Sequence, residues 1–308
     1  MMAKAQDVWT VIRLLQWSTD YLKSKGIDNA RLNVERMLCN VLNLDRIHLY
    51  LHFDRPLTKT ELQAFKALLL RRARNEPLQY ILEEIEFYSL PIKVGPGVLI
   101  PRPETEVLVE RAISVARSFP PPLRLLDVGA GSGAIAIALA KHLPEARISA
   151  IDISDAALKL ARENARRNDV ASRIELRKLD ILSPLPVGWP PQRFHMVVSN
   201  PPYVAPEEKE TLAPEIVEFE PHEALFCQQP LQFYERLAGL APRLLEPEGW
   251  LICEIAPHRA GAVRELFVRH GFHEVEVFPD LAGKARVIQG RMSTKRKGGD
   301  NNESEHLS

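Results

Sequence analysis

From about residue 104 onward, the sequence alternates short apolar runs with longer amphipathic stretches. The runs Leu125–Gly129, Ile148–Ile153 and Trp250–Ile255 are apolar at most of their positions, not only at every second one. Strands have this composition when helices cover both faces of a parallel sheet, because neither face meets water. The alternation therefore predicts an α/β domain over residues 104–292 with a mostly parallel sheet.

The end of this domain adds a different kind of strand pair. Glu274–Phe278 and Arg286–Gln289 are separated only by a short segment that contains a glycine, which is typical of antiparallel neighbours. We therefore expect the last pair of strands to be antiparallel. The other predicted elements are strands over Ile174–Leu179 and Met196–Ser199 and helices over Thr105–Phe119, Gly133–Leu143, Asp155–Asn168, 232–245 and 259–270.

The first 76 residues differ from this pattern, since their apolar residues recur at helical spacing. Thr58 and Glu61 form the Ser/Thr-x-x-Glu sequence of a capping box. Asn29 precedes another apolar helical stretch, and we expect it to cap that helix. We therefore predict a small all-α domain over residues 1–76 that precedes the sheet.

Three arginines, Arg71, Arg72 and Arg74, lie at the end of the last helix of this domain. Positive charge there complements the negative end of the helix dipole, which is one explanation. The other is a docking patch for an acidic partner. The sequence leaves both open.

Residues 77–103 are rich in proline and contain the β-like runs Ile85–Tyr88 and Val98–Ile100. Proline interrupts regular elements, so we predict a β-hairpin or extended connector here. From about Ser293 the residues are polar and charged with no apolar anchor. This composition predicts a disordered tail over residues 293–308.

The charge balance limits the partners of such a chain. Lys plus Arg and Asp plus Glu both number 40, which gives a formal net charge of zero. Proteins that bind nucleic acid through its phosphates usually carry a positive excess, so we expect no stable nucleic-acid binding. No apolar run approaches the roughly 18–20 residues of a membrane span. The three cysteines have no metal-binding spacing and no disulfide pattern, so we expect a cytoplasmic protein without a metal site.

A glycine-rich segment follows the first predicted strand of the α/β domain. Glycines at this position let the backbone pass close to a ligand at the carboxyl end of a strand. Asp152 ends the next strand, where a carboxylate can accept hydrogen bonds from both hydroxyls of a ribose. The pattern fits a dinucleotide, S-adenosylmethionine, or a tight turn without a ligand. The candidate cofactor residues here are Gly129, Ala130, Gly131, Ser132, Gly133 and Asp152.

Asp180 and Ile181 follow the third strand of the domain. The carboxyl ends of strands in an open α/β sheet face the ligand crevice. A carboxylate at Asp180 has the chemistry to bind the exocyclic amine of an adenine, with Ile181 against the ring. The alternative is that Asp180 only opens the loop that follows it.

The fourth strand leads directly into Asn200-Pro201-Pro202-Tyr203. Two prolines stiffen this loop and remove two backbone donors, so that it carries mainly carbonyl acceptors. The Asn200 side-chain oxygen and the Pro201 carbonyl can both accept from one planar NH₂ group, with the Tyr203 ring beside it. Such acceptors stabilise the positive charge that builds on an amide nitrogen as it takes a methyl group. The plain alternative is a proline turn without function.

These motifs together resemble a known family. Asn-Pro-Pro-Tyr after the fourth strand is similar to the S-adenosylmethionine-dependent methyltransferases of amino groups, which include adenine-N6 DNA and protein glutamine-N5 enzymes. The connector distinguishes the two. Gln79–Leu82, Glu86–Tyr88 and the string Val98–Glu106 resemble the release-factor glutamine-N5 methyltransferases (the PrmC/HemK family), as do Phe219–Leu225 and Asp280–Gly283.

The resemblance implies the fold, the reaction and the site. It implies a Rossmann-like methyltransferase sheet, S-adenosylmethionine as cofactor, and methyl transfer to the Gln of the Gly-Gly-Gln motif of class-1 peptide chain release factors. It also implies that the helical domain and the connector dock the release factor, and we expect a monomer. Glutamine methylation of a ribosomal protein and adenine-N6 DNA methylation are the alternatives. The implied catalytic residues are Asn200, Pro201 and Tyr203, which with Pro202 also bind the substrate amide; Gly129–Gly133, Asp152, Asp180, Ile181 and Asn200 bind the cofactor.

The chain departs from the family pattern at three places. Ser89 stands where the family often has glycine, Cys227–Leu231 replaces a glycine-rich run, and Glu254-Ile-Ala replaces Glu-Ile-Gly. None of these lies in the glycine-rich segment or in Asn-Pro-Pro-Tyr. We expect them to affect loop geometry and substrate fit.

Overall fold

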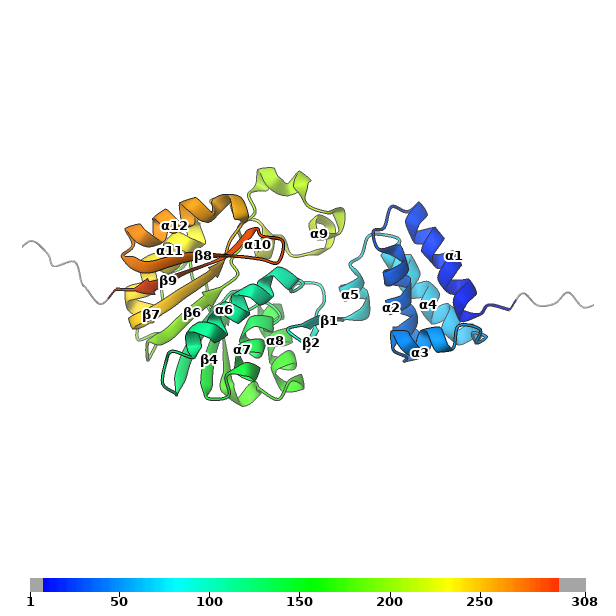
Figure 1. Ribbon diagram of the computed structural model, residues 1–308, viewed down its shortest axis with the longest axis horizontal. Helices are drawn as coiled ribbons and strands as arrows, with labels where there is room; N and C mark the ends of the chain where they lie inside the picture. The colour runs from blue at the N-terminus through cyan, green and yellow to red at the C-terminus, as the bar shows by residue number, and fades with distance from the viewer. Residues whose placement is uncertain (1–7, 294–308) are drawn as a thin grey trace, which may run out of the picture. The chain divides into compact units, whose positions relative to one another are not determined.

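The computed structural model describes residues 8–293. Most of the predicted tail, residues 294–308, lies outside this range. The described residues form two compact units (Figure 1). The helical unit contains the residues up to Ile85, together with Lys93–Ile100 and Lys209–His222. The sheet unit contains Glu86–Ile92, Pro101–Glu208 and the residues from Glu223 onward.

Helices are the main secondary structure of the helical unit, as its sequence predicts. Thr58 accepts from the backbone N–H of Glu61, and Glu61 accepts from that of Thr58, so the predicted capping box is confirmed. Asn29 does occupy the position before its helix, but its backbone is left-handed and its side chain makes no capping bond. The helices are α1 (Val11–Ser24), α2 (Ala30–Leu42), α3 (Arg46–Leu51), α4 (Lys59–Arg72), α5 (Leu78–Leu82) and α9 (Pro214–Phe219).

Two of the three arginines at the end of α4 have acidic partners within the helical unit, whereas Arg74 is exposed. Arg72 is buried, donates to Asn33 Oδ1 over 2.8 Å and pairs with Glu215 of α9 at 2.6 Å. Arg71 pairs with Glu76. These two arginines therefore hold the unit together, and α9 belongs to it although it is far away in the sequence.

The predicted connector contains a hairpin of β1 (Glu84–Phe87) and β2 (Leu90–Lys93). Its turn is formed by Tyr88 and Ser89, which both have positive φ (51° and 59°). Glycine adopts this backbone conformation with the smallest steric cost. The second predicted run, Val98–Ile100, is not a strand. Val98 and Ile100 are buried in an irregular segment instead, and the Val98 carbonyl accepts from the Tyr80 hydroxyl. Burial and not strand pairing explains why that run is apolar.

A sheet of seven strands forms the centre of the sheet unit, within residues 8–293. Its order is β5-β4-β3-β6-β7-β9-β8, parallel from β5 to β7 and antiparallel at β9 and β8, as predicted. The strands are β3 (Leu123–Val128), β4 (Ala146–Asp152), β5 (Ile174–Lys178), β6 (Phe194–Ser199), β7 (Leu245–Glu254), β8 (Phe272–Pro279) and β9 (Ala285–Met292).

Helices cover both faces of this sheet (Figure 1). One face is covered by α6 (Glu106–Ala116), α7 (Ala134–His142) and α8 (Asp155–Arg167), and the other by α11 (Gln232–Leu244) and α12 (Ala260–Arg269). The core on the α11 side includes Leu126, Val197 and Leu251 from three neighbouring strands, each below 2% exposed. Short helices in loops are η1 (Pro103–Thr105), η2 (Ala171–Arg173), η3 (Pro206–Thr211), α10 (His222–Leu225) and η4 (Pro257–Arg259).

The order of the strands reverses beside β3. The chain runs outward from β3 to β4 and β5, then returns to place β6 on the other side of β3. In open α/β sheets, ligands bind at this switch point, outside the carboxyl ends of the strands. Val128 is paired with Ser199 across it, so the glycine-rich segment and Asn-Pro-Pro-Tyr leave the sheet side by side.

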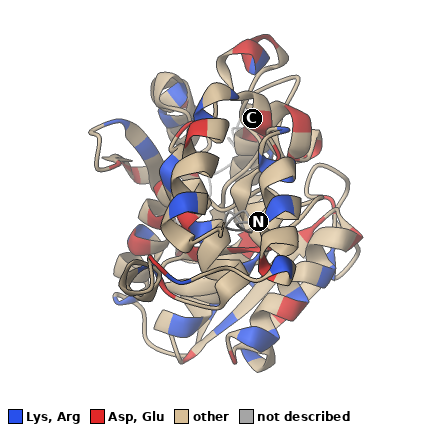
Figure 2. Ribbon diagram, turned by 90° about the vertical axis from the view of Figure 1, so that its right-hand side faces the viewer, with Lys and Arg blue, Asp and Glu red and all other residues tan. Residues whose placement is uncertain are grey.

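Charge of both signs is spread over the chain. Figure 2 shows Lys and Arg interspersed with Asp and Glu along the helices and strands. None of the helices in the described part of the chain has the length and apolar composition needed to cross a membrane.

Candidate functional site

The glycine-rich segment forms a tight turn between β3 and α7. Gly129, Gly131 and Gly133 all have positive φ (80°, 54° and 83°). A Cβ on Gly133 would lie 3.0 Å from the Ala161 Cβ, so this glycine lets α8 pack against the start of α7. A Cβ on Gly131 would meet open space. Gly133 is therefore required for helix packing, whereas the space beside Gly131 leaves room for a ligand.

Asp152 lies directly beside this turn. Its Oδ2 accepts from the Gly131 N–H over 2.8 Å, and its Oδ1 accepts from the Ser154 N–H over 2.9 Å. The carboxylate is only partly buried, and each of its oxygens has a further lone pair. The structure thus brings the predicted ribose-binding carboxylate against the predicted loop, 21 residues away in the sequence.

Sequence reasoning gave no role to Asp127, although it is part of the same motif. Asp127 is completely buried, and its Oδ2 accepts from the N–H of Ala136 in the first turn of α7 over 3.1 Å. Its Oδ1 has no partner within residues 8–293. Burial raises the pKa of this carboxyl to about 7. Asp127 thus fixes the start of α7 beneath the loop.

Asp180 and Ile181 follow β5 at the same edge of the sheet. The Asp180 carboxylate is exposed but accepts from the Leu182 N–H (2.9 Å) and the Ser183 hydroxyl (2.7 Å), so it shapes its own loop. Ile181 is 4% exposed within the core, whereas Leu182 is 38% exposed. Leu182 therefore presents more apolar surface here than the predicted Ile181.

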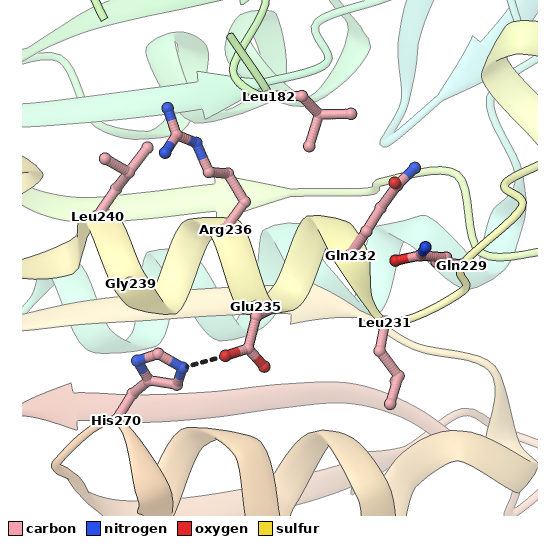
Figure 3. A pocket seen from close by; sticks show the side chains of 9 residues that line it. All are labelled: Leu182, Gln229, Leu231, Gln232, Glu235, Arg236, Gly239, Leu240 and His270. Carbon is pink, nitrogen blue, oxygen red and sulfur yellow. Dashed lines mark hydrogen bonds and ion pairs between the residues drawn. The ribbon is translucent and has the colours of Figure 1, made fainter. Parts of the chain in front are cut away.

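A hollow of about 700 Å³ lies between this loop and α11 (Figure 3). Arg236 donates to the carbonyls of Ile181 (2.8 Å) and Ser183 (2.6 Å), which anchors the loop to α11. Glu235 and His270 interact across the lower side at 2.7 Å. The sequence analysis predicted no site here. The lining residues are Leu182, Gln229, Leu231, Gln232, Glu235, Arg236, Gly239, Leu240 and His270.

Asn-Pro-Pro-Tyr follows β6 on the other side of the switch point. A Cβ on Gly129 would lie 3.9 Å from the Asn200 carbonyl oxygen, so the two motifs are close neighbours. The Asn200 side chain donates from Nδ2 to Thr105 Oγ1 over 3.2 Å. Pro201 is buried, and Pro202 and Tyr203 are partly buried. Of the residues predicted to bind an amide, Asn200, Pro202 and Tyr203 thus keep part of their surface exposed, while a hydrogen bond to Thr105 holds the Asn200 side chain.

Glu254, at the end of β7, is a site residue that sequence reasoning missed. It is 1% exposed and accepts from Thr105 Oγ1 (2.6 Å) and from the Tyr203 hydroxyl (3.2 Å). Burial raises the pKa of Glu254, and burial together with the nearby Glu254 raises the pKa of Tyr203 far above its ordinary value. The available signals were its position near the end of an apolar run and its place in the family pattern Glu-Ile-Gly, which this chain has as Glu254-Ile-Ala.

Comparison with known proteins agrees with this geometry. Residues 13–82 match the model of the PrmC N-terminal domain, and residues 105–225 match that of the methyltransferase small domain. The release factor glutamine methyltransferase of Geobacter sulfurreducens is 42% identical over 292 residues, which cover 94% of this chain and 100% of that protein.

Two solved structures are also similar. A protein-(glutamine-N5) methyltransferase (release factor-specific) from Alicyclobacillus acidocaldarius is 32% identical, with a TM-score of 0.40 over 65% of this chain and 99% of that one. The hMettl16 catalytic domain, solved with an RNA hairpin of the MAT2A 3′UTR, is 17% identical, with a TM-score of 0.53 over 75% of this chain and 83% of that one. The second shares the fold.

The switch-point sheet, the glycine-rich turn and Asn-Pro-Pro-Tyr beside it define a methyltransferase with a Rossmann-like fold. An N-terminal helical unit precedes the sheet unit, as the PrmC N-terminal domain match also indicates. The chain belongs to the family of release factor glutamine methyltransferases.

Proposed function

We propose that this protein transfers a methyl group from S-adenosylmethionine to the side-chain amide nitrogen of the Gln in the Gly-Gly-Gln motif of class-1 peptide chain release factors. The observation that carries the proposal is that two motifs leave neighbouring strands side by side at the switch point. Val128 pairs with Ser199 there, so the glycine-rich turn proposed to bind the cofactor lies next to Asn200, the first residue of the proposed amide-binding loop.

The residues beside the turn fit this cofactor. The open space at Gly131 admits a ligand close to the backbone, and Asp152 offers acceptors to ribose hydroxyls. When bound, S-adenosylmethionine supplies an electrophilic methyl group on a sulfonium. The residues proposed to hold it are Gly129, Ala130, Gly131, Ser132, Gly133, Asp152, Asp180, Ile181 and Asn200.

The Asn-Pro-Pro-Tyr loop acts on the substrate amide. The Asn200 Oδ1 and the Pro201 carbonyl accept from its NH₂ group, which directs the nitrogen lone pair and stabilises the positive charge that develops on it. Tyr203 packs against the amide plane, and Pro202 stiffens the loop. Orientation of the nucleophile supplies a further part of the rate enhancement.

The surplus proton of the methylated amide is expected to pass to water. The Tyr203 hydroxyl donates to Glu254, and the pKa of Tyr203 lies far above its ordinary value, so this phenol stays protonated and does not act as the base. A protonated amide is a strong enough acid to lose its proton without one. The chain thus needs only acceptors at this place.

The substrate is proposed to be a protein that docks on the helical domain (residues 1–76) and the connector (residues 77–103). The equal numbers of basic and acidic residues and their interspersion (Figure 2) favour a protein over a polyanion. Membership in the family supports a release factor as that protein.

The test is mass spectrometry of the Gly-Gly-Gln peptide after incubation of the release factor with this protein and S-adenosylmethionine. A gain of one methyl group on the Gln is expected, with Asn200→Ala as the control that loses it. An unmodified Gln, while a characterised release factor glutamine methyltransferase modifies the same preparation, would overturn the proposal. Ribosomal protein and duplex DNA serve as alternative substrates in parallel reactions.

A further inference from the structure

Two side chains, Thr105 and Tyr203, donate to the buried carboxylate of Glu254, and a third, Asn200, is connected to it through Thr105. Thr105 Oγ1 lies 2.6 Å from Oε2, the Tyr203 hydroxyl lies 3.2 Å from Oε1, and the Asn200 Nδ2 lies 3.2 Å from the same Thr105 oxygen. Thr105 and Glu254 are 149 residues apart in the sequence. One carboxylate is thus connected to both ends of the Asn-Pro-Pro-Tyr loop.

The direction of these hydrogen bonds is determined by the chemistry of the groups. Burial raises the pKa of Glu254, whereas the hydrogen bond from Thr105, the charge of Arg286 and the hydrogen bond from Tyr203 favour the ionised form. An ionised carboxylate only accepts, so the single hydroxyl proton of Thr105 is donated to Glu254 Oε2. The lone pairs of Thr105 then remain to accept, and they bind the NH₂ of Asn200. The two atoms of the Asn200 amide point in different directions, so its Oδ1 is turned away from Thr105. Within residues 8–293, this oxygen has no hydrogen-bond partner.

Glu254 is held firmly enough to impose this direction. Its backbone pairs with Val287 of β9, and its carbonyl accepts from the buried Tyr234 hydroxyl over 2.9 Å. The positive charge of Arg286 lies near enough to act on the carboxylate and is itself anchored at 3.1 Å to Asp280. A carboxylate is costly to bury unless its lone pairs are bonded, and here Thr105 and Tyr203 bond both oxygens.

We propose that Glu254 and Thr105 are positioning residues that set the direction of the Asn200 amide, so that its oxygen and not its nitrogen meets the substrate NH₂. The same carboxylate fixes the Tyr203 ring through its hydroxyl. This inference rests on the proposed function and assigns a role to Thr105, at the end of η1, and to Glu254, at the end of β7. Neither residue touches the reacting atoms.

Thr105 offers a matched pair of variants. Thr105→Val keeps the shape but removes the hydroxyl, and Thr105→Ser keeps the hydroxyl. For Thr105→Val, we expect kcat to fall about 10- to 100-fold, because the amide of Asn200 is free to turn over. The KM for the release factor and the affinity for S-adenosylhomocysteine, measured by calorimetry, should stay within about threefold, since neither contact involves this hydroxyl. Thr105→Ser should recover most of the lost kcat.

The direction itself can be tested by reversing it. In Asn200→Asp, the new carboxylate needs a proton from Thr105, which Glu254 already takes. With Glu254→Gln, the Gln NH₂ can donate to Thr105, and the Thr105 proton becomes available to the carboxylate introduced by Asn200→Asp. We therefore expect Asn200→Asp to lower kcat at least about tenfold less in the Glu254→Gln background than in the wild type.

The outcomes are distinguishable from failure of the proposed function. If the wild type does not methylate the release factor, the proposed function fails. If the wild type is active and Thr105→Val retains its kcat with unchanged melting temperature, the positioning role is wrong. If the effects of Asn200→Asp and Glu254→Gln on kcat are additive, the proposed direction of the Asn200 amide is wrong. A parallel loss of kcat and cofactor affinity in Thr105→Val would reduce Thr105 to a structural residue.

Discussion

The candidate site at the carboxyl ends of the strands has two halves, which are formed in different ways. The glycine-loop half, at the ends of β3 and β4, consists of the turn Gly129–Gly133 and Asp152, and it uses mainly backbone groups close in the sequence. The amide half, at the ends of β6 and β7, depends on side chains of Thr105, Asn200 and Glu254 that are far apart in the sequence. The first half is a local conformation, and the second is a product of the tertiary fold.

This difference leads to separable effects of mutation. Changes in the glycine-loop half should act on cofactor affinity and on stability. Changes in the amide half should act on turnover. A variant in one half that changes the quantity assigned to the other half would contradict this division.

The largest effect is expected for Asn200→Ala. Removal of one acceptor for the developing charge should lower kcat by about 10²–10³-fold, whereas the affinity for S-adenosylhomocysteine should fall far less, because Asn200 is only one of the residues proposed to hold the cofactor. Steady-state kinetics and calorimetry on the same preparation measure the two quantities. An equal loss in both would mean that the two halves are not separable.

Asp127 should make the stability of the protein depend on pH. Its pKa is about 7 in the folded state, against an ordinary value of 3.8. The folded state therefore binds this proton more tightly, so its contribution to stability is lost as pH rises from about 4 to about 7. Between pH 5 and pH 8, the wild type should lose about 2–3 kcal/mol more of unfolding free energy than Asp127→Asn.

Urea unfolding at the two pH values measures this difference. Asp20→Asn, on the exposed side of α1, is the control and should keep the slope of the wild type. An Asp127→Asn variant with the same slope as the wild type would show that the buried carboxyl does not titrate in this range.

Asp152→Asn should weaken cofactor binding by about tenfold, because the amide keeps one acceptor but loses the charge and the second acceptor. At saturating cofactor, kcat should remain near that of the wild type. Asp180→Asn serves for comparison and should weaken cofactor binding less than Asp152→Asn, since the oxygens of Asp180 already accept from its own loop. If Asp152→Asn lowers kcat at saturation, the glycine-loop half also takes part in orientation of the substrate.

The smallest expected effect is a difference in unfolding free energy between alanine variants of two glycines in the turn. Both Gly131 and Gly133 have positive φ, but only at Gly133 would a Cβ collide with Ala161. Gly133→Ala should therefore cost about 1 kcal/mol more unfolding free energy than Gly131→Ala. Gly131→Ala should instead lower cofactor affinity, because its Cβ enters the open space. Equal stabilities of the two variants would contradict the packing role of Gly133.

The same comparison explains what could be predicted from the sequence. The glycine-rich turn and Asp152 could be found because the motif is nearly contiguous and its second part follows at the end of the next strand. The parallel sheet and its antiparallel last pair could also be found, because apolar runs mark buried strands. Asn200–Tyr203 could be found because two consecutive prolines after a strand are uncommon.

The residues that could not be predicted depend on long-range contacts. Thr105 and Glu254 lie in segments that resemble the family, but neither segment indicates a role for them, and only the pairing of β6 with β7 brings Glu254 next to the amide loop. The helix α3 was missed because six residues show little periodicity, although Asp45 caps it by accepting from the His48 N–H. The run Val98–Ile100 looked like a strand because burial alone also selects apolar residues.

The assignment of α9 to the helical unit limits how modular this protein can be. The chain passes between the two units after Ile85, Ile92, Ile100, Glu208 and His222. A cut at the predicted boundary near residue 76 would separate Glu215 from Arg72, and it would leave Ile100, which donates to Glu220, outside the helical fragment. Segments of the helical unit therefore alternate along the chain with segments of the sheet unit, so the helical unit cannot be exchanged between relatives through a single junction near residue 76.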